Sequence, residues 1–221
     1  MPKVVGLFDS FDNLDQVLAE DVASWIKPVP QIVQIENYLA NKILYPQTLP
    51  ITDYDMKIEL AILREALKLN GPKDNDKKGN SLLGDNPFLN ITLRKILIPA
   101  RFLRFVPNLA ILTWVFIDAL LLNRKKEDWF QDLWTVILTD DTEEIVGTVI
   151  LPQFNAGGTM EFFLPDKNYK IQSGSLQVIP CISGRCNISY KLNNGKILGK
   201  SENVIEVCGG KLGLIIDGRI A

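Results

Sequence analysis

Residues 204–217 read VIEVCGGKLGLIID, which is two short apolar runs on either side of a pair of glycines. Both runs have the length and the aliphatic composition of strands, and Gly209-Gly210 suits a turn. We therefore expect β-strands at 204–208 and 211–217. Lys211 follows the glycines, but the spacing is not that of a phosphate-binding loop, and a strand follows where that loop would require a helix.

Six further runs of this kind lead back from residue 204 to Trp129. They are separated by clusters of turn-forming residues, among which Asn194-Gly195 favours a tight type I′ hairpin. The runs lie at 133–138, 145–151, 159–164, 169–172, 176–180 and 187–192. Strands at this spacing predict a small antiparallel β-sandwich or barrel over residues 129–221.

The chain before residue 129 has a helical pattern instead. The clearest helix begins after Thr52, which can cap it, and Met56, Leu60, Leu63 and Leu67 then recur at helical spacing. Apolar residues at similar spacing predict further helices over residues 14–25, 32–45 and 108–122.

The helix predicted at 32–45 has Ile35, Leu39 and Ile43 on its apolar side, with Val33 as a further candidate for that side, and Lys42 among the polar neighbours. A polar run at about 71–88 lacks any periodicity and predicts a flexible loop. The predicted fold class is therefore α+β, with a mainly helical domain over residues 1–128 and an all-β domain over residues 129–221.

Composition and charge exclude several classes of function. Hydrophobic residues make up 47% and charged residues 23% of the chain, which is ordinary for a globular protein. Lysine and arginine number 24 against 26 acidic residues, so no basic field favours nucleic acid as a partner. The apolar run that begins at Val4 is too short for a signal peptide, and we expect a cytoplasmic protein.

Residues 105–122 form an apolar stretch whose length is near the minimum for spanning a membrane. Pro107 and Asn108 interrupt its start, and Asp118 would cost about 3 kcal/mol inside the hydrocarbon. A buried helix from Asn108 is the better interpretation. The basic residues at 124–126 leave peripheral membrane contact as the less favoured alternative.

Candidate chemistry is limited because the chain contains no histidine, the usual general base and the commonest metal ligand. Cys181, Cys186 and Cys208 supply fewer thiolates than a closed zinc site requires and fit reduced thiols. Acidic clusters at 9–12 and 140–144 lack the glycine spacing of phosphate or calcium loops. We predict no catalytic residue, no metal site and no cofactor, and we assign no cofactor-binding residue.

Four segments carry a resemblance to a known family. They lie at 36–50, 59–67, 174–180 and 206–217, and the second of them reads ELAILREAL. Their order is similar to that in the C-terminal half of the MutL-type accessory proteins associated with glutamate mutase. Those proteins belong to the superfamily of sugar kinases, heat-shock proteins and actin-like ATPases. The resemblance spans most of residues 13–219.

The resemblance implies a reduced derivative of a two-lobed ATPase. Members of the family carry glycine- and threonine-rich phosphate loops that this sequence lacks, and residues 98–101 contain no glycine where a glycine-rich adenosine-contacting turn would stand. We expect a non-catalytic accessory or scaffold subunit, bound to a protein partner or to a second copy through candidate anchors Trp25, Tyr38 and Tyr45. The alternative is a nucleotide-binding accessory protein that completes an ATPase with a partner chain and serves a cobalamin-dependent mutase.

Overall fold

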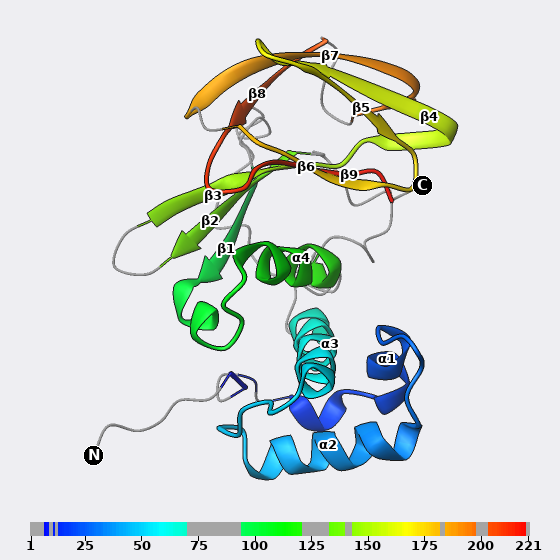
Figure 1. Ribbon diagram of the computed structural model, residues 1–221, viewed down its shortest axis with the longest axis vertical. Coiled ribbons are helices and arrows are strands. Elements are labelled where there is room, and N and C mark those ends of the chain that lie inside the picture. The colour runs from blue at the N-terminus through cyan, green and yellow to red at the C-terminus, as the bar shows by residue number, and fades with distance from the viewer. Residues whose placement is uncertain are drawn as a thin grey trace, which may run out of the picture. The chain divides into compact units, whose positions relative to one another are not determined.

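A computed structural model describes residues 7–8, 11, 13–69, 94–120, 133–139, 143–181, 184–197 and 203–219. Helices dominate the N-terminal half and two β-sheets the C-terminal half, so the predicted α+β class is confirmed (Figure 1). The chain divides into two compact units. The helical unit comprises Met1–Asn80 and Phe102–Asn123, and the β unit comprises Ser81–Arg101 and Arg124–Ala221. The loop predicted at 71–88 lies outside the described residues.

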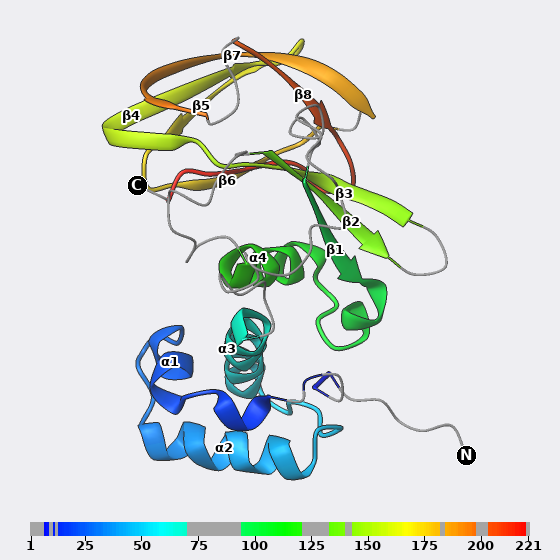
Figure 2. The same ribbon diagram turned by 180° about the vertical axis from the view of Figure 1, so that it is seen from behind.

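The helical unit is built around one central helix. α3 lies between α2 and α4 in both views of the ribbon (Figures 1 and 2), and its Ile62 and Leu63 are fully buried. The helices are η1 Leu14–Gln16, α1 Ala19–Ser24, α2 Ile32–Leu44, α3 Asp53–Leu69, η4 Ala100–Arg104 and α4 Leu109–Leu120, with η4 crossing the boundary between the units.

Side-chain caps fix the starts of the two predicted helices that the sequence marks best. The Asp55 amide donates to Thr52 Oγ1 over 3.1 Å, and the Thr52 amide donates to Asp55 Oδ2 over 2.9 Å, a reciprocal cap at the start of α3. Asn108 Oδ1 accepts hydrogen bonds from the amides of Ala110 and Ile111 at 3.0 and 3.1 Å. Both predicted helix starts are confirmed.

Among the residues that the structure describes, no helix has both the length and the apolar character needed to cross a membrane.

The β unit contains two sheets, neither of which is closed. One has the strand order β1-β2-β3-β9-β6 and the other the order β5-β4-β7-β8 (Figure 1). The strands are β1 Arg94–Pro99, β2 Leu133–Thr139, β3 Glu143–Ile150, β4 Gln153–Phe163, β5 Asn168–Gln172, β6 Leu176–Ile179, β7 Arg185–Lys196, β8 Val204–Cys208 and β9 Gly213–Asp217. Buried residues of both sheets form one hydrophobic cluster that includes Phe162, Ile188 and Leu214.

Two strand pairs differ from the predicted antiparallel arrangement. β1 pairs with β2 in parallel, and β3 pairs with β9 in parallel. The chain leaves β1 and returns to β2 only after α4, and a long connection of this kind permits parallel pairing. The first sheet is therefore mixed, whereas every pair in the second sheet is antiparallel.

Strand β1 lies at residues 94–99, within the half of the chain for which the sequence predicts mainly helices. Ile96 and Ile98 are buried, whereas Lys95 and Leu97 between them are exposed. This alternation is the period-2 signal of a strand with one covered face. The arginine and lysine at its start obscured that signal.

The prediction of a hairpin at Asn194-Gly195 is wrong. β7 continues through both residues, and Asn194 has a positive φ of 55° where the register with β4 shifts. The Asn155 side chain donates to Asn194 Oδ1 over 3.1 Å, and Asn194 Nδ2 donates to the Ala156 carbonyl over 2.9 Å. Residues typical of turns therefore build a bulge between two long strands here, and the strand pairing decides between the two outcomes.

Candidate protein-interaction surface

A buried ion pair joins α2 to α3. Lys42 and Glu59 are 1% and 2% exposed, and the Lys42 ammonium pairs with Glu59 Oε1. The Tyr38 hydroxyl donates to the same oxygen over 3.1 Å. Helical periodicity predicts Ile43 on the apolar side of α2, but Ile43 is 46% exposed and Lys42 takes the buried position. Lys42 can occupy this buried position because the carboxylate of Glu59 gives it a buried partner of opposite charge.

Burial and neighbouring groups shift the pKa values of the side chains around the Lys42–Glu59 pair. Burial raises the pKa of Glu59, although Lys42 and the hydroxyl of Tyr38 act to lower it. Burial, followed by the charge of Glu59, raises the pKa of the Tyr38 hydroxyl, so that the hydroxyl remains a donor. The Lys42 ammonium also lies 5.6 Å from the ring centroid of Phe8 and 5.9 Å from that of Tyr38.

The same lysine fixes the connection between α2 and α3. Its ammonium donates to the Thr48 carbonyl, and the Thr48 amide donates to the Tyr45 carbonyl over 3.1 Å. At the far end, Asp55 Oδ2 accepts hydrogen bonds from the amides of Ile51 and Thr52. Burial acts to raise the pKa of Asp55, but these hydrogen bonds hold it below its ordinary value. The connection is therefore anchored in its middle and at its end.

The anchored connection and the helix ends that adjoin it expose large apolar side chains. Ile51 is 93% exposed, Leu44 71% and Leu49 63%. Such side chains are ordinary when scattered singly, but a concentration of them marks an interaction site. We name this group the α2–α3 surface, and it comprises Ile43, Leu44, Tyr45, Leu49, Ile51 and Tyr54.

The outer face of α2 extends the apolar character. Val33, Ala40 and Leu44 are all exposed, and their spacing of seven and four residues places them along one side of the helix. Ile35 and Leu39 lie on the opposite, buried side. α2 therefore has apolar residues on two sides, of which the buried side packs within the helical unit.

The exposed charges in this part of the chain are mainly acidic. Between residues 13 and 57, the exposed lysines are Lys27 and Lys57. The exposed acidic residues there are Asp15, Glu20, Asp21, Glu36 and Asp53. An apolar surface within an acidic region favours a partner that combines apolar and basic groups.

The three predicted anchors have different environments. Trp25 is half-buried, and its indole nitrogen donates to Glu65 Oε1 over 2.5 Å. Arg64 and Lys68 lie 5.1 and 4.8 Å from the centroid of that ring. Tyr38 is half-buried against Glu59, whereas Tyr45 is 53% exposed. The structure therefore places Tyr45 on the α2–α3 surface and binds the other two into the helical unit.

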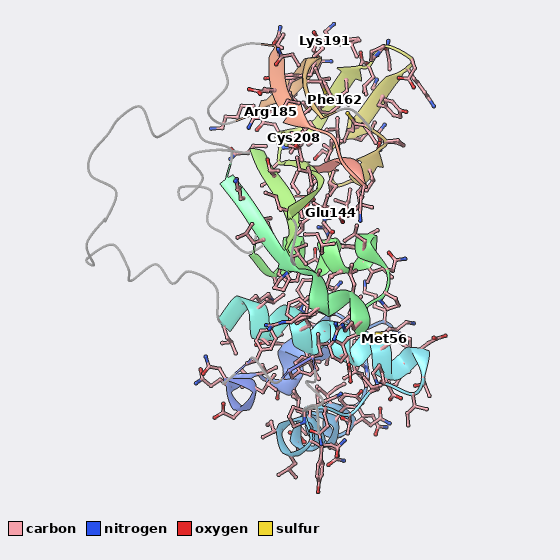
Figure 3. All side chains as sticks on the ribbon, turned by 90° about the vertical axis from the view of Figure 1, so that its left-hand side faces the viewer. Met56, Glu144, Phe162, Arg185, Lys191 and Cys208 are labelled. Atoms are coloured by element: carbon pink, nitrogen blue, oxygen red, sulfur yellow. The ribbon has the colours of Figure 1, made fainter. Side chains whose placement is uncertain are left out.

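The remaining sequence features have structural partners. Lys211 lies in the connection between β8 and β9, and its ammonium pairs with Glu144 Oε2, a residue labelled in Figure 3. Gly209 and Gly210 lie in the connection that leads from β8 in one sheet to β9 in the other, and their amides donate to the carbonyls of Gly184 and Cys181. Residues 9, 10, 12 and 140–142 of the two acidic clusters lie outside the described residues. In the part of the chain that is described, no group of three or more His, Cys, Asp or Glu side chains has the arrangement of a metal site.

Comparisons of the chain with protein-family models, curated proteins and solved structures found no match. The resemblance to the accessory proteins of glutamate mutase stays a prediction.

Proposed function

We propose that this chain is a non-catalytic accessory subunit that docks a protein partner on the α2–α3 surface. The observation that carries the proposal is the exposure of six large apolar side chains within residues 43–54, which comprise the connection fixed by Lys42 and Asp55 and the adjoining ends of α2 and α3. A loop held in one conformation loses little entropy when it binds, so its apolar contacts contribute more of their free energy to affinity.

The partner that fits best is a protein segment with an apolar face and basic flanks, such as an amphipathic helix. Leu44 and Leu49 offer aliphatic area, and Tyr45 offers an aromatic anchor. The acidic residues Glu36 and Asp53 would attract the basic flanks of such a segment.

The same charges argue against two other occupants. An anionic membrane would repel exposed acidic residues such as Glu36 and Asp53. A second copy of the chain would bring equal charges together, which disfavours a homo-oligomer through this face. We infer in addition that the two sheets of the β unit form a sandwich, supported by their shared hydrophobic cluster. We also infer that the protein acts in the cytoplasm, a reducing compartment that suits its three free thiols.

The test uses two labelled amphipathic helical peptides of about 18 residues, one of leucine and lysine and the other of leucine and glutamate. Fluorescence polarisation with the full chain should show binding of the lysine peptide, weaker at high salt, and little binding of the glutamate peptide. The double variant Leu44→Ser, Leu49→Ser should lower the affinity at least about tenfold, because two aliphatic contacts are lost without any change of charge.

Val178→Ser is the matched control, since Val178 is 49% exposed but lies on β6 of the β unit. Equal binding of the lysine peptide by the double variant and the wild type would contradict the proposal. A lysine peptide that does not bind the wild type would also contradict it. If the wild type sedimented with anionic vesicles and the double variant did not, the surface would be assigned to a membrane instead. If the wild type self-associated and the double variant did not, the surface would be assigned to a second copy of the chain.

A further inference from the structure

The three cysteines gather at one end of the β unit. Cys181 follows β6, Cys186 is the second residue of β7, and Cys208 ends β8. The sulfur atoms of Cys181 and Cys186 are 3.9 Å apart. Arg185 and Cys208 are register partners on β7 and β8, and Figure 3 shows them side by side. All three thiols are free.

We propose that Cys181 and Cys186 are an oxidative modification site that forms a reversible intramolecular disulfide. A disulfide needs a sulfur separation of about 2.05 Å, so the two sulfur atoms have to approach by roughly 2 Å. Side-chain rotation supplies a movement of that size. Because β6 and β7 belong to different sheets, the bond would link the two sheets covalently.

Cys208 is the less suitable partner although it lies nearby. Its amide donates to Thr148 Oγ1, and its carbonyl accepts from the same hydroxyl, both over 2.9 Å. Thr148 is fully buried and Cys208 is 4% exposed, so this thiol is held in the core. Cys186 is only half-buried, which makes it the thiol that a small oxidant in water reaches first.

A peroxide supplies the oxidising equivalents. The Cys186 thiolate attacks one peroxide oxygen, so that an S–O bond forms, the O–O bond breaks, and one water leaves after protonation. The Cys181 sulfur then displaces the hydroxyl of this sulfenic acid, so that the S–S bond forms, the S–O bond breaks, and a second water leaves. In total the two thiols lose two electrons and two protons, and hydrogen peroxide is reduced to two waters.

The reaction should be slow at neutral pH. Burial, with the neighbouring Cys181 and Cys208, raises the pKa of the Cys186 thiol to about 11. Arg185 and Glu206 are the charged side chains of the adjoining strand positions, and both are exposed. Since only the thiolate attacks, the oxidation rate should rise about tenfold per pH unit below that pKa.

The experiment treats the full chain with hydrogen peroxide and measures its intact mass and its tryptic peptides. The expected product is a monomer lighter by about 2 Da, the mass of two hydrogen atoms. Trypsin cleaves after Arg185, so the bond should join the peptide of residues 171–185 to that of residues 186–191. Dithiothreitol should restore the original mass.

Matched variants decide which thiols take part. Cys208→Ser should still form the bond, whereas Cys181→Ser should lose it and accumulate sulfenic or higher acids at Cys186. Cys181→Ala repeats the test without a new hydroxyl, and the thermal unfolding of each reduced variant shows that it is folded. A bond that includes Cys208, a disulfide-linked dimer, or oxidation of wild type to higher acids without an S–S bond would overturn the proposal.

Discussion

A Cβ atom placed on Gly147 of β3 would lie 2.0 Å from the carbonyl oxygen of Gly213 in β9. The two glycines are register partners in a parallel pair of strands, and Gly213 has a positive φ of 89°. Gly147→Ala should therefore lower the free energy of unfolding by about 2–4 kcal/mol, because the strands must separate to admit the methyl group. Urea denaturation measures this change.

Gly184→Ala is the control for that substitution. A Cβ atom there meets no atom within 4 Å, so we expect a change within about 0.5 kcal/mol. Similar unfolding midpoints for the two alanine variants would show that β3 and β9 are not in close contact at Gly147.

The buried ion pair gives a second prediction. Lys42→Met should destabilise the protein by about 3–5 kcal/mol, because Glu59 would remain buried without a counter-charge. Adding Glu59→Leu to Lys42→Met should recover most of that loss. Urea denaturation measures the free energy of unfolding of the single and the double variant. A double variant less stable than Lys42→Met would argue against a buried pair.

The pH dependence of the same variant is a third prediction. Lys42 lowers the pKa of Glu59, so its removal should raise that pKa further above its value in the unfolded chain. A native state with the higher carboxyl pKa binds more protons than the unfolded state, and its stability falls as the pH rises through that pKa. The destabilisation by Lys42→Met should thus be larger at about pH 7.5 than near pH 4.5, and equal losses at both pH values would contradict it.

Helix α4 gives a fourth prediction, which concerns the apolar stretch from Asn108. Leu112 is fully buried, whereas its neighbour Ile111 is 38% exposed. Leu112→Asp should destabilise the chain by about 4 kcal/mol or more through an unpaired buried charge, and Ile111→Asp should cost far less. Wild-type protein that pellets with membranes and resists carbonate extraction would favour membrane insertion of this helix instead.

Nucleotide binding is the subject of the last prediction. The purified chain should show no micromolar affinity for ATP by calorimetry, since the Lys211 ammonium pairs with Glu144 and residues 98–101, where β1 meets η4, include no glycine. Tight binding of ATP would support the alternative in which this chain completes an ATPase with a partner.

Local signals were the part of the fold that could be predicted from the sequence. Thr52 and Asn108 cap their helices through residues two or three positions away, so a short window contains all the necessary information. The bulge at Asn194 could not be predicted, because it depends on Asn155, 39 positions earlier in the chain. Turn chemistry alone does not distinguish a hairpin from a bulge.

The candidate site was predictable only in part for the same reason. Tyr45 was anticipated as an anchor, but the sequence gives no sign that Lys42 is buried until Glu59 is known to face it. A lysine in an amphipathic helix is normally exposed, so helical periodicity assigned the core position to Ile43. Pairs of this kind emerge only when two helices are placed side by side.

The anchoring of the α2–α3 connection also bears on how this protein could evolve. Its backbone is held by Lys42 and Asp55, whereas Leu44, Leu49 and Ile51 point into solvent and contribute little to the core. Substitutions at those three positions should therefore change which partner is recognised and leave folding almost unaffected. Such a surface can diverge rapidly among relatives, and partner choice can be reprogrammed in the laboratory without compensating changes elsewhere in the chain.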